Sequence, residues 1–416
     1  MIELVEIAKF YTSAEWYILF FVIALTFISA KIFGLNYINA ILIAQFWTVF
    51  NTVPIISGSF SGLVPNYLII QFFFCEAIFL LSVMYVYSII LNKSKIHLSE
   101  ITDFFDGKIL YLLISFSFIA ALLNYTFTPQ DGTSRILYQT NYWYSFVKPF
   151  YQVSTPISFF AVFILIFTNR RRKSAYLLLT LNILASIASG SKGAFVMQAL
   201  TGILMVRDLN VLTKHKFNRF DILTAAASII LAFAFALDRL EVTFSQLLFR
   251  ILLFGEPTLL TYYAPDPTAA CQNLTTFAKM HRGWARALGD PTALNIDTLF
   301  GYAWTIQYFG TNTFTGPNAR FGAYMACNFP GSSVFIGLAV SLFYLSLIVL
   351  SVITAAKRFR MVAMVYPFCV FSLIASGQDF NILMQDINIL ILFIGLCIFI
   401  TTKVAPIDRP SKLAAS

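Results

Sequence analysis

Long apolar runs alternate with short polar connections along most of the chain. Runs at 16–30, 67–91, 150–167 and 335–352 stand out. Each is about 15 to 25 residues long, close to the roughly 20 residues that a helix needs to cross about 30 Å of hydrocarbon. Helices buried in a soluble core are usually shorter. The pattern therefore predicts transmembrane helices.

The whole chain is predicted to be an all-α polytopic integral membrane protein with a single transmembrane domain, residues 1–416. We expect about 11 (10–12) spanning helices. They are placed at 17–33, 37–57, 67–91, 109–124, 149–168, 174–189, 193–206, 221–237, 332–354, 361–376 and 387–402. Charged residues make up 11% of the chain, against about 25% in soluble proteins. This composition excludes an ordinary water-soluble globular protein.

The net charge of +9 is collected in short basic clusters between the expected spans. The clusters are Lys93, Lys95 and Lys108; Arg170, Arg171, Arg172 and Lys173; Arg207, Lys214, Lys216 and Arg219; Lys357, Arg358 and Arg360; and Lys403, Arg409 and Lys412. By the positive-inside rule these connections face the cytoplasm, which accounts for the charge without a nucleic-acid partner. The C-terminus is then inside. Only Lys31 marks the turn after the first span, so the orientation of the N-terminus stays open.

One connection, residues 238–331, is far longer than the others and is expected outside. Long loops in compact proteins are usually functional, so candidate chemistry is sought there. No internal repeat accompanies it, which gives an inverted-repeat transporter no support. No cysteine pair has metal-ligand spacing, and neither a metal nor a cofactor is expected. Cys271 and Cys327 are both external on this topology, and whether they form a disulfide is left open.

A short turn, 189–193, reads Ser-Gly-Ser-Lys-Gly between two basic connections. Each flanking arm has about 15 residues and reaches roughly 22 Å, less than the hydrocarbon thickness. The turn is therefore expected in a recess below the outer surface, where an unpartnered lysine costs about 2.5–3.5 kcal/mol. Lys192 is interpreted as a phosphate contact, and the alternative is a lysine that snorkels to the headgroups.

The external segment carries the other candidate groups. Residues 238–256 are expected to form a helix at the outer interface, in which Arg239 and Arg250 suit a diphosphate because the guanidinium fork donates two hydrogen bonds. The alternative is that they pair with Glu241, Glu256 or lipid headgroups. His281, the one external histidine, is a candidate general base or phosphate partner, and the alternative is a structural or solvated histidine. Glu256 and Asp297 are rival bases.

Within the expected spans, Glu76 is the clear ionisable residue at depth. An intramembrane carboxylate is a functional candidate by default. It could equally pair with a polar side chain of a neighbouring span, so Glu76 is not assigned to catalysis.

Two stretches carry a family resemblance. Residues 315–337, Thr-Gly-Pro-Asn-Ala-Arg-Phe-Gly-Ala-Tyr-Met-Ala-Cys-Asn-Phe-Pro-Gly-Ser-Ser-Val-Phe-Ile-Gly, and the turn 189–193 resemble Wzy-type O-antigen and oligosaccharide repeat-unit polymerases. The layout is also similar, with one large periplasmic loop late in the chain and two or three closing spans. The resemblance implies a GT-C-like polymerase/ligase architecture in the bacterial inner membrane. It also implies a metal-independent glycosyltransferase that acts at the periplasmic face on undecaprenyl diphosphate-linked glycans, with a chain-length regulator as partner.

Residue by residue, Lys192 stands where this family often has arginine, and Arg250 and Arg320 stand in loop regions that hold its essential basic residues. Arg320 and Gly331 match an arginine, ten residues and a glycine, whereas Arg282 and Arg286 do not show that spacing. We expect catalysis from Arg250, Glu256 and His281, and diphosphate binding from Lys192, Arg239, Arg282, Arg320 and Asn318.

The implied reaction transfers a growing glycan from its lipid diphosphate to a hydroxyl of an incoming lipid-linked repeat. The related O-antigen ligase uses the same donor and differs only in its acceptor, a lipid A core sugar. A lipid-linked oligosaccharide flippase or other transporter would also explain the spans, but it would not need so large an external segment.

Overall fold

The computed structural model describes residues 16–35, 66–93, 98–127, 142–188, 192–209, 274–294, 321–329, 331–356 and 359–376, together with 380, 383–384, 387 and 389–390. Within these ranges every regular element is helical. The elements are α2 (Trp16–Ile32), α6 (Asn66–Lys93), α7 (Leu98–Asp106), α8 (Lys108–Phe127), α10 (Tyr142–Phe167), α11 (Arg172–Ala188), α12 (Lys192–Asp208), α16 (Thr276–Ala287), α17 (Pro291–Leu294), α19 (Phe321–Asn328), the 3-10 helix η4 (Gly331–Ser333), α20 (Val334–Ala356) and α21 (Phe359–Ala375).

The expected spans that fall in the described ranges coincide with α2, α6, α8, α10, α11, α12, α20 and α21. Four described stretches are long and apolar enough to cross a membrane: Phe74–Asn92, Lys108–Thr126, Phe150–Phe167 and Gly331–Ala356. The expected spans at 37–57 and 221–237 and most of 387–402 lie outside the described residues. The described part is thus that of a helical membrane protein, and the total of about 11 spans stays a prediction.

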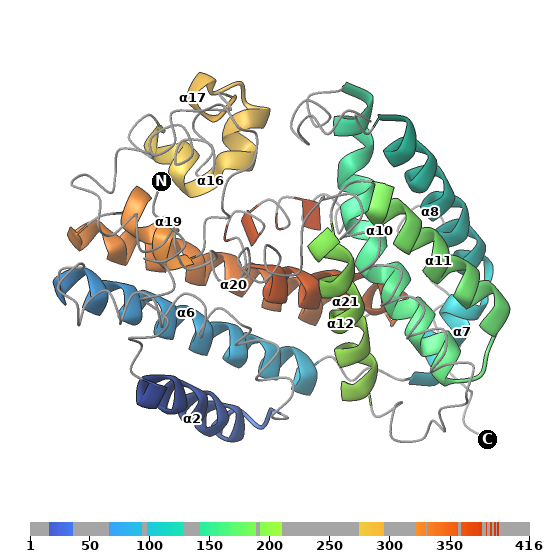
Figure 1. The fold of residues 1–416 in the computed structure, drawn as a ribbon, viewed down its shortest axis with the longest axis horizontal. Helices are drawn as coiled ribbons and strands as arrows, with labels where there is room; N and C mark the ends of the chain where they lie inside the picture. Colours follow the sequence, from blue (N-terminus) through green and yellow to red (C-terminus); the bar gives the residue numbers. More distant parts are fainter. Residues whose placement is uncertain are drawn as a thin grey trace, which may run out of the picture.

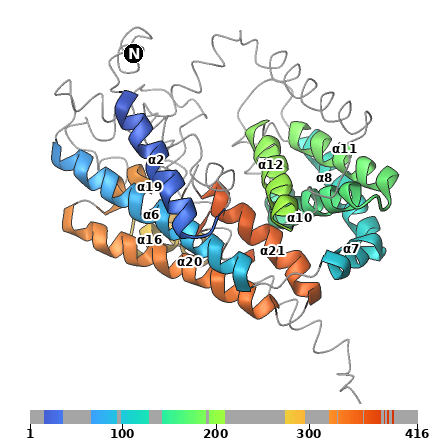
Figure 2. The ribbon, with the colours of Figure 1, turned by 90° about the horizontal axis from the view of Figure 1, so that it is seen from below.

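The described helices form two groups joined by α21. Figure 1 shows α2, α6, α19 and α20 on one side and α8, α10, α11 and α12 on the other. In Figure 2, α21 lies between the α6–α20 pair and the second group, and it packs against α20, α10 and α12. The hairpin of α16 and α17 lies next to α19 and α20, in the first group.

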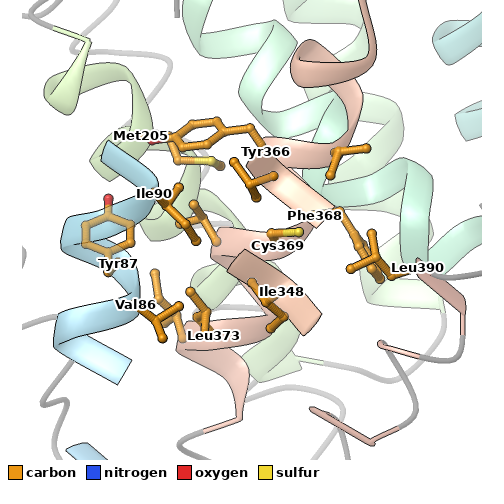
Figure 3. Packing of buried hydrophobic residues seen from close by; sticks show 14 of the residues in the cluster. Val86, Tyr87, Ile90, Met205, Ile348, Tyr366, Phe368, Cys369, Leu373 and Leu390 are labelled. Atoms are coloured by element: carbon orange, nitrogen blue, oxygen red, sulfur yellow. The ribbon is translucent and has the colours of Figure 1, made fainter. Parts of the chain in front are cut away.

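The packing around α21 is dense and apolar. Figure 3 shows Tyr366 and Cys369 of α21 in one cluster with Ile90 of α6, Met205 of α12 and Ile348 of α20, while Phe368 lies next to Leu390. Helices surrounded by lipid associate through close packing and hydrogen bonds, because lipid tails are as apolar as the helix surface. Small residues allow that approach: a Cβ on Gly202 would lie 2.7 Å from Phe163 Cδ2 of α10.

Helix α7 was not expected from the sequence. It buries Ile101, Thr102 and Phe105 on one face, while Asp106 accepts a 3.0 Å hydrogen bond from Arg171 Nε and Asp103 pairs with Arg170. These ion pairs are exposed, so each contributes only about 0–1 kcal/mol. They nevertheless bring α7 and the connection at 169–171 to one end of the molecule, and the cytoplasmic placement of this end stays a prediction.

Two further contacts gather other connections at the same end. Tyr87 of α6 donates a hydrogen bond to Asp208 at the end of α12, and Ser88 Oγ donates to the carbonyl of Phe33, just after α2, at 2.7 Å. The ends of α2, α6 and α12 therefore lie on one side of the structure.

Helix α19 folds back along the first turns of α20. Gly337 of α20 makes the close approach possible, because a Cβ there would lie 2.8 Å from Phe329 Cδ2 and closer still to Met325 Sδ. At its other end Phe321 stacks on Phe79 of α6, with ring centroids 4.2 Å apart. The end of the long expected external segment is thus packed between two apolar helices.

Replacing Gly337 by valine tests this packing. Gly337→Val forces Met325 and Phe329 apart and is expected to destabilise the protein by about 1–3 kcal/mol, seen as a lower thermal unfolding midpoint in detergent. Ala339→Val is the matched control, because Ala339 lies exposed on the same helix and surface changes usually stay within about 0.5 kcal/mol. Equal shifts in both variants would contradict the close contact of α19 and α20.

Candidate functional site

The first turn of α19 is held by Glu76. Glu76 Oε1 accepts a 2.6 Å hydrogen bond from the backbone N–H of Gly322. Glu76 lies ten positions into α6, about 15 Å from its first residue, so α19 begins well inside the length of a spanning helix. Phe380 packs edge-on against Phe321, with ring centroids 5.0 Å apart, and thus lies against the same first turn of α19.

A helix that begins among apolar helices needs hydrogen-bond acceptors for its first backbone N–H groups. Its first N–H groups lack helical partners, and an unsatisfied backbone group away from water costs several kcal/mol. A carboxylate stabilises such a helix start in two ways. It accepts these hydrogen bonds, and its negative charge interacts favourably with the positive end of the helix dipole. The structure gives Glu76 an anchoring contact with a backbone N–H of α19, a partner that neither sequence-based interpretation had named.

Helix α16 is broken at His281, whose backbone is not helical (φ −150°, ψ 55°). The two carbonyls before the break accept hydrogen bonds from outside the helix. Tyr324 of α19 donates to the Lys279 carbonyl, and Tyr344 of α20 donates to the Met280 carbonyl at 3.0 Å. In a continuous helix such oxygens bond the N–H groups four residues on, and here the tyrosine hydroxyls add donors from neighbouring helices at the point where the helical geometry is interrupted.

The imidazole of His281 lies in this same contact. Its Nδ1 is 2.5 Å from the Tyr344 hydroxyl, the two rings meet edge to face with centroids 5.0 Å apart, and Phe277 lies on another side at 6.0 Å. The ring is half-buried, and burial lowers the pKa of His281 below its ordinary 6.5, because a low-dielectric surrounding disfavours the charged form. A neutral imidazole at pH 7 is suited to accept a proton.

The rest of the α16–α17 hairpin is held by its own polar groups. Thr275 Oγ1 accepts from the N–H of Ala278 at 3.1 Å and donates to Asp290 Oδ2 at 2.6 Å. Asp290 Oδ1 in turn accepts from the N–H of Thr292 at 2.9 Å. Thr275 and Asp290 therefore cap the starts of α16 and α17, which makes the hairpin a locally ordered platform for His281.

The other predicted site residues fall in different places. Lys192 is the first residue of α12, and Arg282 lies in α16, although the placement of neither side chain is described. Outside the described residues lie Arg239, Arg250, Glu256, Asp297, Asn318 and Arg320, as does Cys271 of the possible disulfide. Of the predicted residues, His281 is thus the one whose surroundings can be stated.

The two helices that flank the turn 189–191, α11 and α12, are as short as the sequence predicts. Helices α11 and α12 are 17 residues long each, about 25 Å at about 1.5 Å per residue, which is less than the hydrocarbon thickness of about 30 Å. Lys192 opens a helix whose first backbone N–H groups point away from its body. This position belongs to the second helix group, whereas His281 lies with the first.

Polar contacts below that turn were missed by sequence reasoning. Ser117 Oγ donates to Asn182 Oδ1 at 3.0 Å, and Asn124 Nδ2 donates to the Ala185 carbonyl at 2.8 Å. They join α8 to α11 as interhelical hydrogen bonds commonly do in membranes. The signal was present as serine and asparagine inside apolar runs.

Tyr344 and Tyr324 were also missed. Both are buried, Tyr344 in the apolar helix α20 and Tyr324 in the short helix α19, and a buried tyrosine usually finds a partner for its hydroxyl. Such a tyrosine indicates that some polar group lies opposite, but the sequence does not identify which. Within the described residues, no group of three or more His, Cys, Asp or Glu side chains is arranged to hold a metal.

No protein-family model, curated protein or solved structure matches the chain significantly.

The anchoring role of Glu76 predicts a specific pattern of stability. Glu76→Leu removes the acceptor for the Gly322 N–H and is expected to cost about 1–3 kcal/mol. Glu76→Gln keeps a carbonyl oxygen in the same place and is expected to retain most of the stability. Thermal unfolding of the purified protein in detergent measures both. A glutamine variant as unstable as the leucine variant would argue against the anchoring role.

Proposed function

We propose that the protein polymerises undecaprenyl diphosphate-linked oligosaccharide repeat units at the periplasmic face of a bacterial inner membrane. The observation that carries the proposal is His281, a half-buried imidazole at the break in α16 whose Nδ1 contacts the Tyr344 hydroxyl of α20 and whose pKa is lowered by burial. The resemblance of 189–193 and 315–337 to repeat-unit polymerases supports the substrate class. The apolar helices support a lipid-linked donor.

In this proposal His281 acts as the general base. It takes the proton from a sugar hydroxyl of the acceptor, and the resulting oxygen attacks the anomeric carbon of the donor glycan. The bond from that carbon to the diphosphate oxygen breaks, and the lipid diphosphate leaves with the electron pair. Glu256 and Asp297 remain rival bases. The reaction needs no metal, because positioned cationic side chains stabilise the departing charge.

Lys192, Arg239, Arg250, Arg282 and Arg320, with Asn318, are proposed to hold the diphosphate. Guanidinium groups bind phosphate oxygens in pairs, and the start of α12 offers backbone N–H groups beside Lys192, a favourable setting for an anion. A chain-length regulator is the proposed protein partner.

Elongation by the purified protein tests the proposal. The substrate is the lipid-linked oligosaccharide extracted from source cells that lack this protein, and the product is read as a ladder on a gel. His281→Gln is expected to lower kcat by about 10²–10⁴-fold, the contribution of a positioned base. His215→Gln, in an expected cytoplasmic connection, is the matched control and retains the ladder.

Lys192→Ala, in the same assay, is expected to weaken the ladder, whereas Lys192→Arg retains the charge and most of the activity. Transfer to a lipid A core sugar without elongation would show a ligase and contradict the polymerase proposal. Translocation of the lipid across vesicle membranes, with no new glycosidic bond, would show a transporter and contradict the polymerase proposal.

The pH dependence follows from the lowered pKa of His281. A general base works when neutral, and kcat/KM reports the pKa of the free enzyme. Activity is therefore expected to be full at pH 7 and to fall as the pH decreases through a value below 6.5. Initial rates of elongation at limiting substrate, from about pH 3.5 to 8, measure this. A midpoint of the acidic fall in kcat/KM above pH 6.5 would contradict His281 as the base. A midpoint near pH 4.3, the ordinary pKa of a glutamate, would favour Glu256.

A further inference from the structure

The Tyr344 hydroxyl has two hydrogen-bonding neighbours but only one proton. It lies 3.0 Å from the Met280 carbonyl oxygen and 2.5 Å from His281 Nδ1. A carbonyl can only accept, whereas a neutral imidazole nitrogen donates or accepts according to its tautomer. The carbonyl therefore decides how the protons in this group are arranged.

Two arrangements are possible, and one leaves a partner unsatisfied. If Tyr344 donates to His281 Nδ1, no proton lies between its oxygen and the Met280 carbonyl. Two oxygen lone pairs then face each other beside a buried tyrosine, which is costly where water is excluded. If Tyr344 donates to the carbonyl, its oxygen accepts a proton from Nδ1 and both contacts are hydrogen bonds.

The second arrangement specifies the chemistry of the ring. A neutral imidazole carries one N–H, and here it is at Nδ1. The lone pair is then on Nε2, the nitrogen on the side of the ring away from Tyr344. The nitrogen that is available to take a proton is thereby defined by a contact on the opposite side of the ring.

We propose that Tyr344 is a positioning residue that holds His281 as the Nδ1–H tautomer and presents Nε2 as the proton acceptor. The identity of the proton donor, a sugar hydroxyl of the acceptor glycan, rests on the proposed function. The tautomer itself does not.

The framework around Tyr344 suits this role. Tyr344 is fully buried near the middle of α20, a continuous helix of 23 residues, and a group on a rigid element positions its neighbour better than one on a loop. Tyr324 donates to the adjacent carbonyl of Lys279. The broken turn is thus held at two successive carbonyls, and Tyr344 also contacts the imidazole.

The titratable groups near this turn are few in the described part of the chain. They include Tyr344 on α20, Tyr324 on α19, and Lys279 and Asp290 in the α16–α17 hairpin itself. Arg282 and Arg286 also belong to α16, and the placement of their side chains is not described. Asp290 is bonded to Thr275 and Thr292, which keeps it engaged within the hairpin. The tyrosines remain protonated near neutral pH because their ordinary pKa is about 10.

The tautomer can be measured directly. The full-length protein, labelled with ¹⁵N-histidine and placed in lipid nanodiscs, gives ring ¹⁵N shifts that distinguish a protonated from an unprotonated nitrogen. Signals of His281 are assigned by their loss in His281→Gln. At pH 8 we expect a protonated Nδ1 and an unprotonated Nε2 in the wild type. In Tyr344→Phe we expect the Nε2–H tautomer to become populated, because it is intrinsically favoured in a free imidazole.

Tyr324→Phe is the matched control. It removes the same hydroxyl from the neighbouring carbonyl, so a purely structural role would give both variants the same effect. We expect Tyr324→Phe to keep the Nδ1–H tautomer. In the elongation assay, Tyr344→Phe is expected to lower kcat by about 10- to 100-fold, part of what a positioned base supplies, with little change in KM.

Two results would overturn the inference: an Nε2–H tautomer in the wild-type protein, or equal ring shifts in the two phenylalanine variants. If the Nδ1–H tautomer is lost only in Tyr344→Phe, the inference stands. That remains so if the wild type elongates no lipid-linked glycan, in which case the proposed function alone fails.

Discussion

Backbone groups that lie among spanning helices need partners within the protein, and much of the described site follows from this constraint. Lipid offers no hydrogen bonds to a free N–H or C=O. Helix α19 begins beside α6, and Glu76 accepts from its Gly322 N–H. Helix α16 breaks beside α20, and Tyr324 and Tyr344 donate to the carbonyls before the break. Both irregular points are thus satisfied by side chains from neighbouring helices.

These contacts also connect the long segment that is expected outside, residues 238–331, to the apolar helices. Glu76 and Gly322 are 246 positions apart, and Tyr344 and His281 are 63 apart. Close packing supports them, since Gly337 admits Met325 and Phe329 against α20. A segment held in this way presents its polar groups at fixed places, which a freely moving loop would not do.

The same interactions link stability to chemistry at His281. A hydroxyl that satisfies the Met280 carbonyl also sets which imidazole nitrogen carries the proton, and burial of the ring keeps it neutral at pH 7. A base prepared in this way fits glycosyl transfer to a sugar hydroxyl. In the proposed reaction, the basic residues assigned to diphosphate binding, among them Lys192 at the start of α12, supply positive charge for the departing lipid diphosphate.

The sequence by itself determined the helical membrane character, the bounds of α6, α8, α10 and α20 to within a few residues at most ends, and His281 as a candidate. Those features depend on local hydrophobicity and length. Only the tertiary structure decided that α19 folds back along α20, that Glu76 caps it and that Tyr344 meets His281. Each depends on which distant residues lie opposite one another, and a local pattern carries no information about that pairing. A polar residue in an apolar span shows that a partner is needed, but only packing selects it.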